Sequence, residues 1–573
     1  MAKVLLTTLV WIYSLAAGLH GFLAPILLVV IPSRQVLRLI FLTYFFQFCL
    51  LPALVLVWYR DSIQPAAVEV KNQSSDDEDE TRSLLPSPTS RDDSANGNVL
   101  RNRRNSEARS PTATSPGSAL HSSESQGFFT FLKSRKMRTA LLVLSFVANT
   151  TLFGLCMDFV YRPYLKEQHR DLQLTRVGAV GSDYARVFVR APTEATLALE
   201  FTPAKEETWA VCESGVVVSA ANDYTAIATC NQLAPKTTYH YRWVKADGQP
   251  LFADTKAADY RFKTAPVDLA KAKYSFAFTS CVKPGFPYMT KGIQGFREMG
   301  KQDLSFVMFL GDLIYADAPT LYGTDVDTYR WHYRYLYSHA DFRDTFRRIP
   351  FLTIYDDHEI LNDWEFDHAD PYPAAFKAFN EYAGLTNPQK DANESAIFEY
   401  AFGDTAFFVM DTRGYRDPKT GTMLGDAQKK RVQDWLLRVK DKYTIKFLVS
   451  SVPLTQNWQW EQRDTWAGYL RERQEILDFI STNDIRNVMA ISGDRHEVAV
   501  TKLPGNVIEF STSPLQAFYS PIETYRETAE DQKIFSWRPG RIKWGRFTID
   551  TTKSTPTATY ALFVNDYQGM VHT

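Results

Sequence analysis

The stretch "FVMFLGDLIYAD", residues 306–317, decides how this chain folds. Its first five residues are all apolar, which predicts a short strand covered on both faces. The strand ends at Gly311, and oxygen-bearing side chains follow at Asp312, Tyr315 and Asp317. Strands covered on both faces occur between layers of helices, and in such folds ligands bind where the strands end.

More apolar runs of this kind alternate with helical patterns after residue 274. The runs are "YSFAFTSC", "PFLTIYDD", "AFFVMDTR", "IKFLVSSVP" and "RNVMAISGD". Helical patterns cover residues 326–339, 374–382, 426–440 and 471–482. Because buried strands alternate with helices, we predict an α/β layered domain over residues 270–573.

Residues of the types that bind metals follow several of these predicted strands. Beside Asp312 and Tyr315, they are Cys281, Asp357, His358, Asn362, Asp494 and His496. A carboxylate can bridge two metals about 3.5–4 Å apart. Thiolate, phenolate and imidazole together favour iron, whereas Asp and Asn oxygens suit calcium, manganese or magnesium. We therefore expect two or more unlike metal ions, with Arg413 clamping a phosphate through two hydrogen bonds.

The motifs also resemble a known family when they are taken in chain order. They are "SC" (280–281), "GDLIYAD" (311–317), "DDHEILND" (356–363), "DTRGYR" (411–416) and "SGDRH" (492–496). This order resembles the PhoD-like alkaline phosphatase/phosphodiesterase family, within the purple-acid-phosphatase-like metallophosphoesterases. The resemblance covers about residues 274–550, and the β-rich segment before it is similar to the usual N-terminal domain of that family.

The resemblance implies a role for each matched residue. Iron would be held by Cys281, Asp312, Tyr315 and His496, with Asp312 bridging to the next cation. Asp357, Asn362 and Asp494 would face the second cation or cations. His358 would steady the substrate or protonate the leaving oxygen. A metal-binding role for Asp356 is left open, and Asp317 is interpreted as a turn residue.

Residues 165–266 contain several short alternating runs, such as "YARVFVRA" and "TTYHYRWVKA", but no helical pattern. Strands at this spacing, with Asp247-Gly248 as a turn signal, predict a fibronectin-III-like β-sandwich. Cys212 and Cys230 both lie in this segment. They could form a disulfide in an oxidising compartment. The sequence alone does not decide whether this disulfide forms.

The N-terminal part is predicted to lie in a membrane. A spanning helix needs about 20 apolar residues, and three uncharged stretches are long enough. They give two helices within residues 1–59 and a third at 139–160, separated by a disordered linker at 60–138. Basic residues just before the third helix place the linker in the cytosol. The catalytic domain is then lumenal or extracellular, and the glycosylation sequon at Asn393 agrees with this placement.

The charge balance argues against a nucleic-acid-binding surface, since 64 Lys and Arg face 65 Asp and Glu. The predicted function is that of a membrane-anchored phosphoesterase, which hydrolyses phosphate mono- or diesters with a metal-activated hydroxide. Two alternatives stay open. One is a phosphodiesterase acting on membrane glycolipids or lipid anchors, and the other is a non-enzymatic receptor or scaffold. The secretory pathway, the vacuole and the plasma membrane are all compatible locations.

Overall fold

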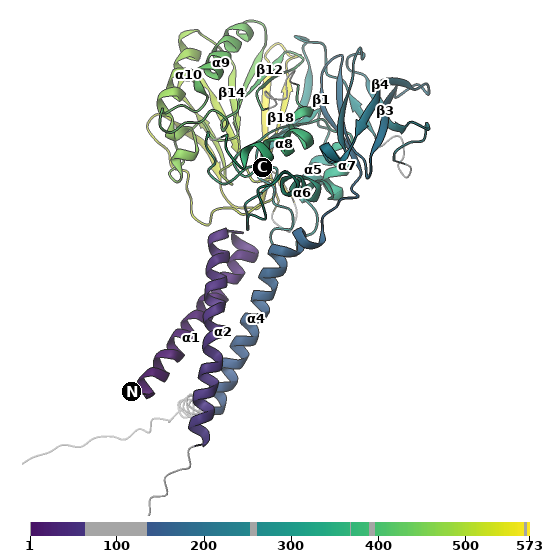
Figure 1. Ribbon diagram of the computed structural model, residues 1–573. Helices are drawn as coiled ribbons and strands as arrows, with labels where there is room; N and C mark the ends of the chain where they lie inside the picture. The colour runs from purple at the N-terminus through teal and green to yellow at the C-terminus, as the bar shows by residue number, and fades with distance from the viewer. Residues whose placement is uncertain are drawn as a thin grey trace, which may run out of the picture. The chain divides into compact units, whose positions relative to one another are not determined.

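The computed structural model describes residues 2–63, 135–252, 260–366, 368–388, 396–565 and 570–572 (Figure 1). Contacts divide the chain into two compact units. One contains residues 1–17 and 45–149, and the other contains residues 18–44 and 150–573. The predicted glycosylation site Asn393, and residues 64–134 of the predicted linker, lie outside the described residues.

Long apolar helices make up the N-terminal part. They are α1 (Ala2–Pro25), the short π-helix η1 (Ile26–Val30), α2 (Arg34–Ile63) and α4 (Arg135–Lys166). Three segments, Thr7–Val30, Arg34–Leu56 and Met137–Lys166, have the length and apolar character of a membrane span. All three spans predicted from the sequence are therefore helices, and the third extends beyond its predicted limits of 139 and 160.

Two small antiparallel sheets follow the helices. One has the order β1 (Leu174–Val180), β2 (Ala185–Arg190), β5 (Thr225–Cys230). The other has the order β4 (Ala210–Val218), β3 (Ala195–Pro203), β6 (Thr238–Lys245), β7 (Arg261–Lys263). Val187, Leu199 and Trp243 belong to the core between them. A disulfide from Cys212 on β4 to Cys230 on β5 joins the two sheets.

Two larger sheets form the C-terminal domain. The first has the order β10 (Phe351–Ile354), β9 (Phe306–Leu310), β8 (Lys273–Thr279), β18 (Ile542–Asp550), β19 (Thr557–Asn565), β20 (Met570–His572). The second has the order β11 (Phe398–Phe402), β12 (Thr405–Val409), β13 (Ile445–Val449), β14 (Val488–Ser492), β16 (Ile508–Thr512), β15 (Val498–Lys502), β17 (Gln532–Trp537). Strands β8, β9 and β10 are parallel, as are β12, β13, β14 and β16.

Aromatic side chains fill the space between the two large sheets. The Phe276 and Phe306 rings from the first sheet stack with centroids 5.0 Å apart, and the Phe407 and Phe447 rings from the second do the same. The Phe276 ring also meets the Phe447 ring edge to face at 5.4 Å. Edge-to-face and offset pairs are the favoured arrangements of aromatic rings, so this layer joins the sheets firmly.

Helices cover the outer faces of both large sheets (Figure 1). The first sheet carries α5 (Gln294–Gly300), α6 (Val326–Tyr337), α7 (Ala340–Phe346) and α8 (Tyr372–Tyr382). The second carries α9 (Gly425–Val439) and α10 (Leu470–Thr482). The order of layers is helix, sheet, sheet, helix, which agrees with the predicted α/β layered domain.

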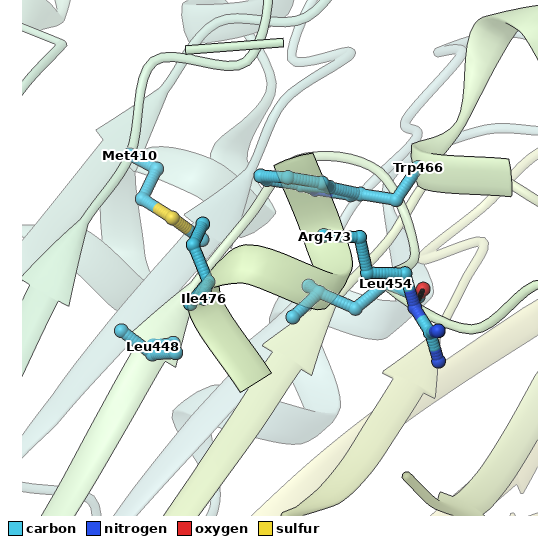
Figure 2. A pocket seen from close by; sticks show the side chains of 6 residues that line it. All are labelled: Met410, Leu448, Leu454, Trp466, Arg473 and Ile476. Carbon is cyan, nitrogen blue, oxygen red and sulfur yellow. Dashed lines mark hydrogen bonds between the residues drawn. The ribbon is translucent and has the colours of Figure 1, made fainter. Parts of the chain in front are cut away.

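Figure 2 shows the side chains that line a small gap between β13 and α10. Leu448 of β13 and Ile476 of α10 line a gap too small for a water molecule, together with Trp466. Arg473 borders the gap, and its Nε donates a hydrogen bond of 2.6 Å to the Leu454 carbonyl. This gap is a packing imperfection in the core and offers no binding site.

A buried ionic network ties the small sheets to the helices of the large domain. Asp223 accepts hydrogen bonds from Arg190 of β2 at 3.2 Å and from Arg334 of α6 at 2.6 Å. Burial by itself raises the pKa of Asp223, but the two guanidinium groups outweigh it and lower that pKa. The Tyr382 hydroxyl, at the end of α8, also donates to Asp223. Because the members of this network are buried and paired, the small sheets are held against α6 and α8.

The aromatic layer predicts a large cost for removing one of its rings. Phe276→Ala should lower the free energy of unfolding by about 3–5 kcal/mol, because the cavity left between two sheets cannot collapse. Guanidinium unfolding of the full chain in detergent, followed by fluorescence, measures this. Leu437→Ala, on the exposed face of α9, is the control and should change it by less than about 0.5 kcal/mol. Equal midpoints for the two variants would contradict this view of the core.

Candidate metal centre

The residues after the parallel strands adopt an unusual backbone conformation. Cys281 follows β8 with φ 64°, Asp312 follows β9 with φ 55°, and Asp494 follows β14 with φ 69°. His496, two residues further on, has φ 56°. Non-glycine residues rarely adopt this left-handed conformation, which costs free energy and is concentrated at functional sites. Four residues predicted as metal ligands share it.

Asp312 lies at the centre of the cluster. Three groups of side chains have ligand atoms within 4.8 Å of one another and include Asp312. Its companions in the three groups are Cys281 with His496, Asp357 with His358, and Asp356 with Asp494. A carboxylate that belongs to several ligand groups at once is suited to bridge two cations.

The four residues predicted to hold iron lie in contact with one another. The Cys281 thiol donates to Asp312 Oδ2 at 3.3 Å, and the Tyr315 hydroxyl donates to the same oxygen at 3.2 Å. The Tyr315 hydroxyl is also 2.9 Å from His496 Nε2. All four side chains are buried. The structure thus brings together Cys281, Asp312, Tyr315 and His496 from three separate loops.

The charges in this cluster fit a cation. Burial raises the pKa of Asp312 and Asp494 well above the usual carboxyl range, and neighbouring carboxylates add to the effect. Burial and then the charges of Asp312 and Asp494 raise the pKa of the Cys281 thiol. Asp312 Oδ1, Asp357 Oδ1 and Asp494 Oδ2 are buried and have no hydrogen-bond partner. Buried carboxylate oxygens without hydrogen-bond donors are the ligands that metal ions require.

The structure differs from the prediction at Arg413. Its side chain is 0% exposed, and its Nε donates to Asp356 Oδ1 at 2.6 Å. Its Nη2 donates to Asp464 Oδ2 at 3.0 Å and lies 3.4 Å from Asp357 Oδ1. These carboxylates already use the guanidinium donors, so Arg413 is not available to clamp a phosphate. Sequence reasoning could not distinguish a phosphate from a carboxylate as the partner of an arginine.

Asn362 is at the same edge of the domain, but its side chain is exposed. Its backbone N–H donates to Asp317 Oδ2 at 2.8 Å. A role of its amide as a metal ligand stays a prediction. The neighbouring Asp363, which the sequence analysis did not select, forms a further group of potential ligands with Asp357 and Asp464.

Asp317, which was interpreted from the sequence as a turn residue, contacts the candidate catalytic residue His358. Its Oδ1 accepts a hydrogen bond of 2.7 Å from His358 Nδ1. Burial lowers the pKa of His358, but the carboxylates of Asp317, Asp357 and Asp312 outweigh it and raise that pKa well above the ordinary value. The His358 ring also lies 4.2 Å from the Tyr315 ring. Asp317 therefore favours the protonated form of His358 and orients its ring beside the cluster.

Glu359 is a second residue that sequence reasoning missed. Its carboxylate accepts from the backbone N–H of Asp312 at 3.0 Å and from that of Asp356 at 2.7 Å. One side chain thus holds the loops after β9 and β10 together, with the potential ligands of both. Its position directly after His358 in "DDHE" was the available signal, but a glutamate in a loop has many other partners.

Comparisons with known proteins match the part of the chain that contains this cluster. Residues 276–560 match the family model of the PhoD-like phosphatases. The chain is 25% identical over 333 residues to alkaline phosphatase D of Bacillus subtilis (strain 168), covering 46% of this chain and 54% of that protein. It thus spans about half the length of this curated relative.

A solved structure described as the structure of PhoD has the same fold. It matches with a TM-score of 0.54 at 18% identity, over 71% of this chain and 92% of that one. The resemblance found in the sequence is confirmed, and residues 276–560 form a PhoD-like phosphatase domain.

Asp312 belongs to three ligand groups, so its substitution should affect the binding of every metal ion. Asp312→Asn should lower the content of every bound metal, because the substitution weakens each ligand group at once. Metal analysis of the purified full chain by mass spectrometry measures this. The control is Asp426→Asn, an exposed aspartate at the start of α9 that belongs to none of the ligand groups. Unchanged metal content in Asp312→Asn would contradict the bridging role.

Proposed function

We propose that this chain is a membrane-anchored, metal-dependent hydrolase of phosphate mono- or diesters. The observation that carries the proposal is the meeting of three ligand groups at Asp312, inside a PhoD-like phosphatase domain. The apolar helices support the anchoring. The predicted lumenal or extracellular side of the catalytic domain, and its place in the secretory pathway, vacuole or plasma membrane, remain part of this proposal.

Two sets of residues would hold the metals. Cys281, Asp312, Tyr315 and His496 suit iron because thiolate, phenolate and imidazole are ligands that iron accepts. Asp312, Asp357 and Asp494 supply hard oxygens, which suit calcium, manganese or magnesium. When bound, such a pair of cations neutralises charge on the phosphoryl oxygens and lowers the pKa of a water molecule.

His358 is the residue placed to move a proton in this reaction. Hydrolysis breaks the bond from phosphorus to the ester oxygen and forms a new bond from phosphorus to the oxygen of water. The departing ester oxygen then needs a proton. With Nδ1 held by Asp317, His358 can deliver that proton from Nε2. A carboxylate behind a catalytic imidazole fixes both its tautomer and its orientation.

We assign Arg413 a positioning role in place of the phosphate clamp. It fixes Asp356 and lies beside Asp357, so the loop after β10 keeps its carboxylates facing the cluster. Ser451 supports the same loop by donating to Asp356 Oδ1 at 2.6 Å. These bonds leave Asp356 well supplied with donors, whereas Asp357 Oδ1 has no hydrogen-bond partner. Asp357 is therefore the better candidate ligand of the two.

The non-enzymatic alternative predicts a different set of residues. A receptor or scaffold has no need for a buried thiol, phenol and imidazole around one aspartate, since none of them offers a surface to a partner. The described site retains all four of these side chains in contact. We therefore favour the enzyme.

Activity on soluble esters tests the proposal. The full chain in detergent, supplied with iron and calcium, should release p-nitrophenol from p-nitrophenyl phosphate, from bis(p-nitrophenyl) phosphate, or from both. Asp312→Asn should reduce turnover by about 10³-fold, because several kcal/mol of charge stabilisation is lost. The control is Asp426→Asn, an exposed aspartate at the start of α9. Equal turnover in the two variants would rule out this site as the catalytic centre.

The pairing of Asp317 with His358 predicts a dependence on the leaving group. Asp317→Asn should lower kcat for an alkyl phosphate by about 10²-fold, the usual contribution of a general acid. p-Nitrophenolate leaves readily without a proton, so p-nitrophenyl phosphate should lose much less. His358→Asn should give the same pattern. Equal losses on both substrates, or an effect confined to KM, would show that the pair does not serve the leaving oxygen.

A further inference from the structure

Two loops of the large domain that carry site residues, and a third that lies against His496, also contact the ends of the apolar helices. The compact unit of residues 18–44 and 150–573 contains both the loops and these helix ends. The first candidate span ends at Val30, and the second begins at Arg34, so the turn between them lies where the chain leaves the apolar segment. Contacts with this turn locate the loops relative to the spans.

The first loop follows Cys281. Phe286 is fully buried in a cluster with Leu27 of η1 and Phe159 of α4. The Tyr288 N–H donates to the Leu28 carbonyl at 2.8 Å. Tyr288, which contacts the end of the first span, therefore follows the candidate iron ligand Cys281 by seven residues in the sequence.

The second loop follows Asp317, the partner of His358. In it, the Tyr322 hydroxyl donates to the Val160 carbonyl of α4. The Tyr322 ring also stacks on the Tyr164 ring with centroids 4.7 Å apart. This loop meets the end of the third span, so two different helices contact the same edge of the domain.

The third loop runs beside His496. The Phe518 ring meets the His496 ring edge to face at 4.2 Å, and Phe518 also packs against the cluster at the helix ends. The Ala517 N–H donates to the Arg541 carbonyl at 3.1 Å, and Arg541 Nη2 donates to the Val29 carbonyl at 2.6 Å. One phenylalanine thus touches both a candidate metal ligand and the helix ends.

Exposed apolar side chains lie next to these contacts. Met289, which follows Tyr288, is 65% exposed, and Ile522 of the third loop is 55% exposed. Trp537, at the end of β17, is 39% exposed. Its neighbour Arg538 donates to the Ser520 carbonyl at 2.8 Å, which brings Trp537 beside the third loop. We call Met289, Ile522 and Trp537 the apolar rim.

We propose that the apolar rim lies in the interface of the bilayer that the helices span, and that the substrate is a phosphate ester carried by a lipid of that bilayer. This inference rests on the proposed function. Because the site loops are bonded to the ends of the spans, the site stands at the level of the lipid headgroups. Tryptophan and apolar side chains beside a span are typical of that interface. A substrate confined to the same bilayer is also present at high local concentration.

A matched pair of substrates tests the proposal on the full chain in lipid nanodiscs. Hexadecyl p-nitrophenyl phosphate inserts into the disc, whereas methyl p-nitrophenyl phosphate stays in solution, and both break the same bond. For monoesters the pair is dioleoyl phosphatidic acid and glycerol 3-phosphate. We expect the membrane member of the pair to be hydrolysed with at least about tenfold higher kcat/KM.

The results with the two substrates distinguish a failure of this inference from a failure of the proposed function. Hydrolysis of no soluble or membrane ester means that the proposed function fails. Hydrolysis of the soluble member with no preference for the membrane member overturns the lipid-borne substrate alone.

Variants of the apolar rim sharpen this test. Met289→Asp combined with Ile522→Asp should lower turnover of the membrane ester by about tenfold, because a carboxylate resists entry into the interface. Turnover of the soluble ester should stay within about twofold. Leu437→Asp, a similarly exposed leucine on α9 at 49% exposure, is the control and should change neither rate. Equal losses on both esters would overturn the proposal.

Tryptophan quenching tests the position of the rim without any activity measurement. Nanodiscs containing brominated lipid should quench part of the protein fluorescence. Trp11 is exposed within the first span and contributes to this quenching in every variant. Trp537→Phe, a conservative change outside the site, should therefore lower the quenched part without abolishing it. If quenching is the same with and without Trp537, the rim does not touch lipid, and the proposal is wrong.

Discussion

The structure depends on the crowding of ionisable groups around Asp312. Burial and the proximity of like charges both oppose the anionic forms of Asp312, Asp494 and Cys281. Such an arrangement is unfavourable in a chain that has only a fold to stabilise. Bound cations would relieve this repulsion and would couple their binding free energy to folding. The surrounding loops hold this cluster in place.

Buried polar contacts hold the cluster from several directions. Glu359 accepts from the backbone of the loops after β9 and β10. The Ser280 hydroxyl accepts from the Asp494 N–H at 2.9 Å and so ties the first sheet to the second. Arg413 and Ser451 fix Asp356. Left-handed backbone at the four candidate ligand positions is tolerated because these contacts over-determine it.

Local patterns were sufficient for much of the fold. The apolar run at 306–310 became β9 with those limits, and the predicted helix at 426–440 became α9, Gly425–Val439. The residue types after each strand identified most of the cluster, because the carboxyl ends of parallel strands meet at one edge. Strands β18 and β19 were not predicted, since alternating runs at the end of a chain say little about which sheet they join.

Long-range pairing was beyond the sequence. Asp317 and His358 are 41 residues apart, and neither motif indicates that one carboxylate serves the other. Arg413 follows a strand in the position of a phosphate ligand, but the burial that commits it to carboxylates is a property of the folded chain. Phe518 has no motif at all, although it lies between His496 and the helix ends. Each of these pairings becomes visible only in the folded chain.

Anomalous X-ray diffraction from crystals of the metal-loaded chain is the decisive test of the bridge at Asp312. If Asp312 bridges two cations, at least two metal peaks should lie about 3.5–4 Å apart, each bonded to one oxygen of Asp312. The first should also be bonded to Cys281, Tyr315 and His496, and the second to Asp357 and Asp494. A single peak that avoids Asp312, or peaks that share no ligand, would rule out the bridge.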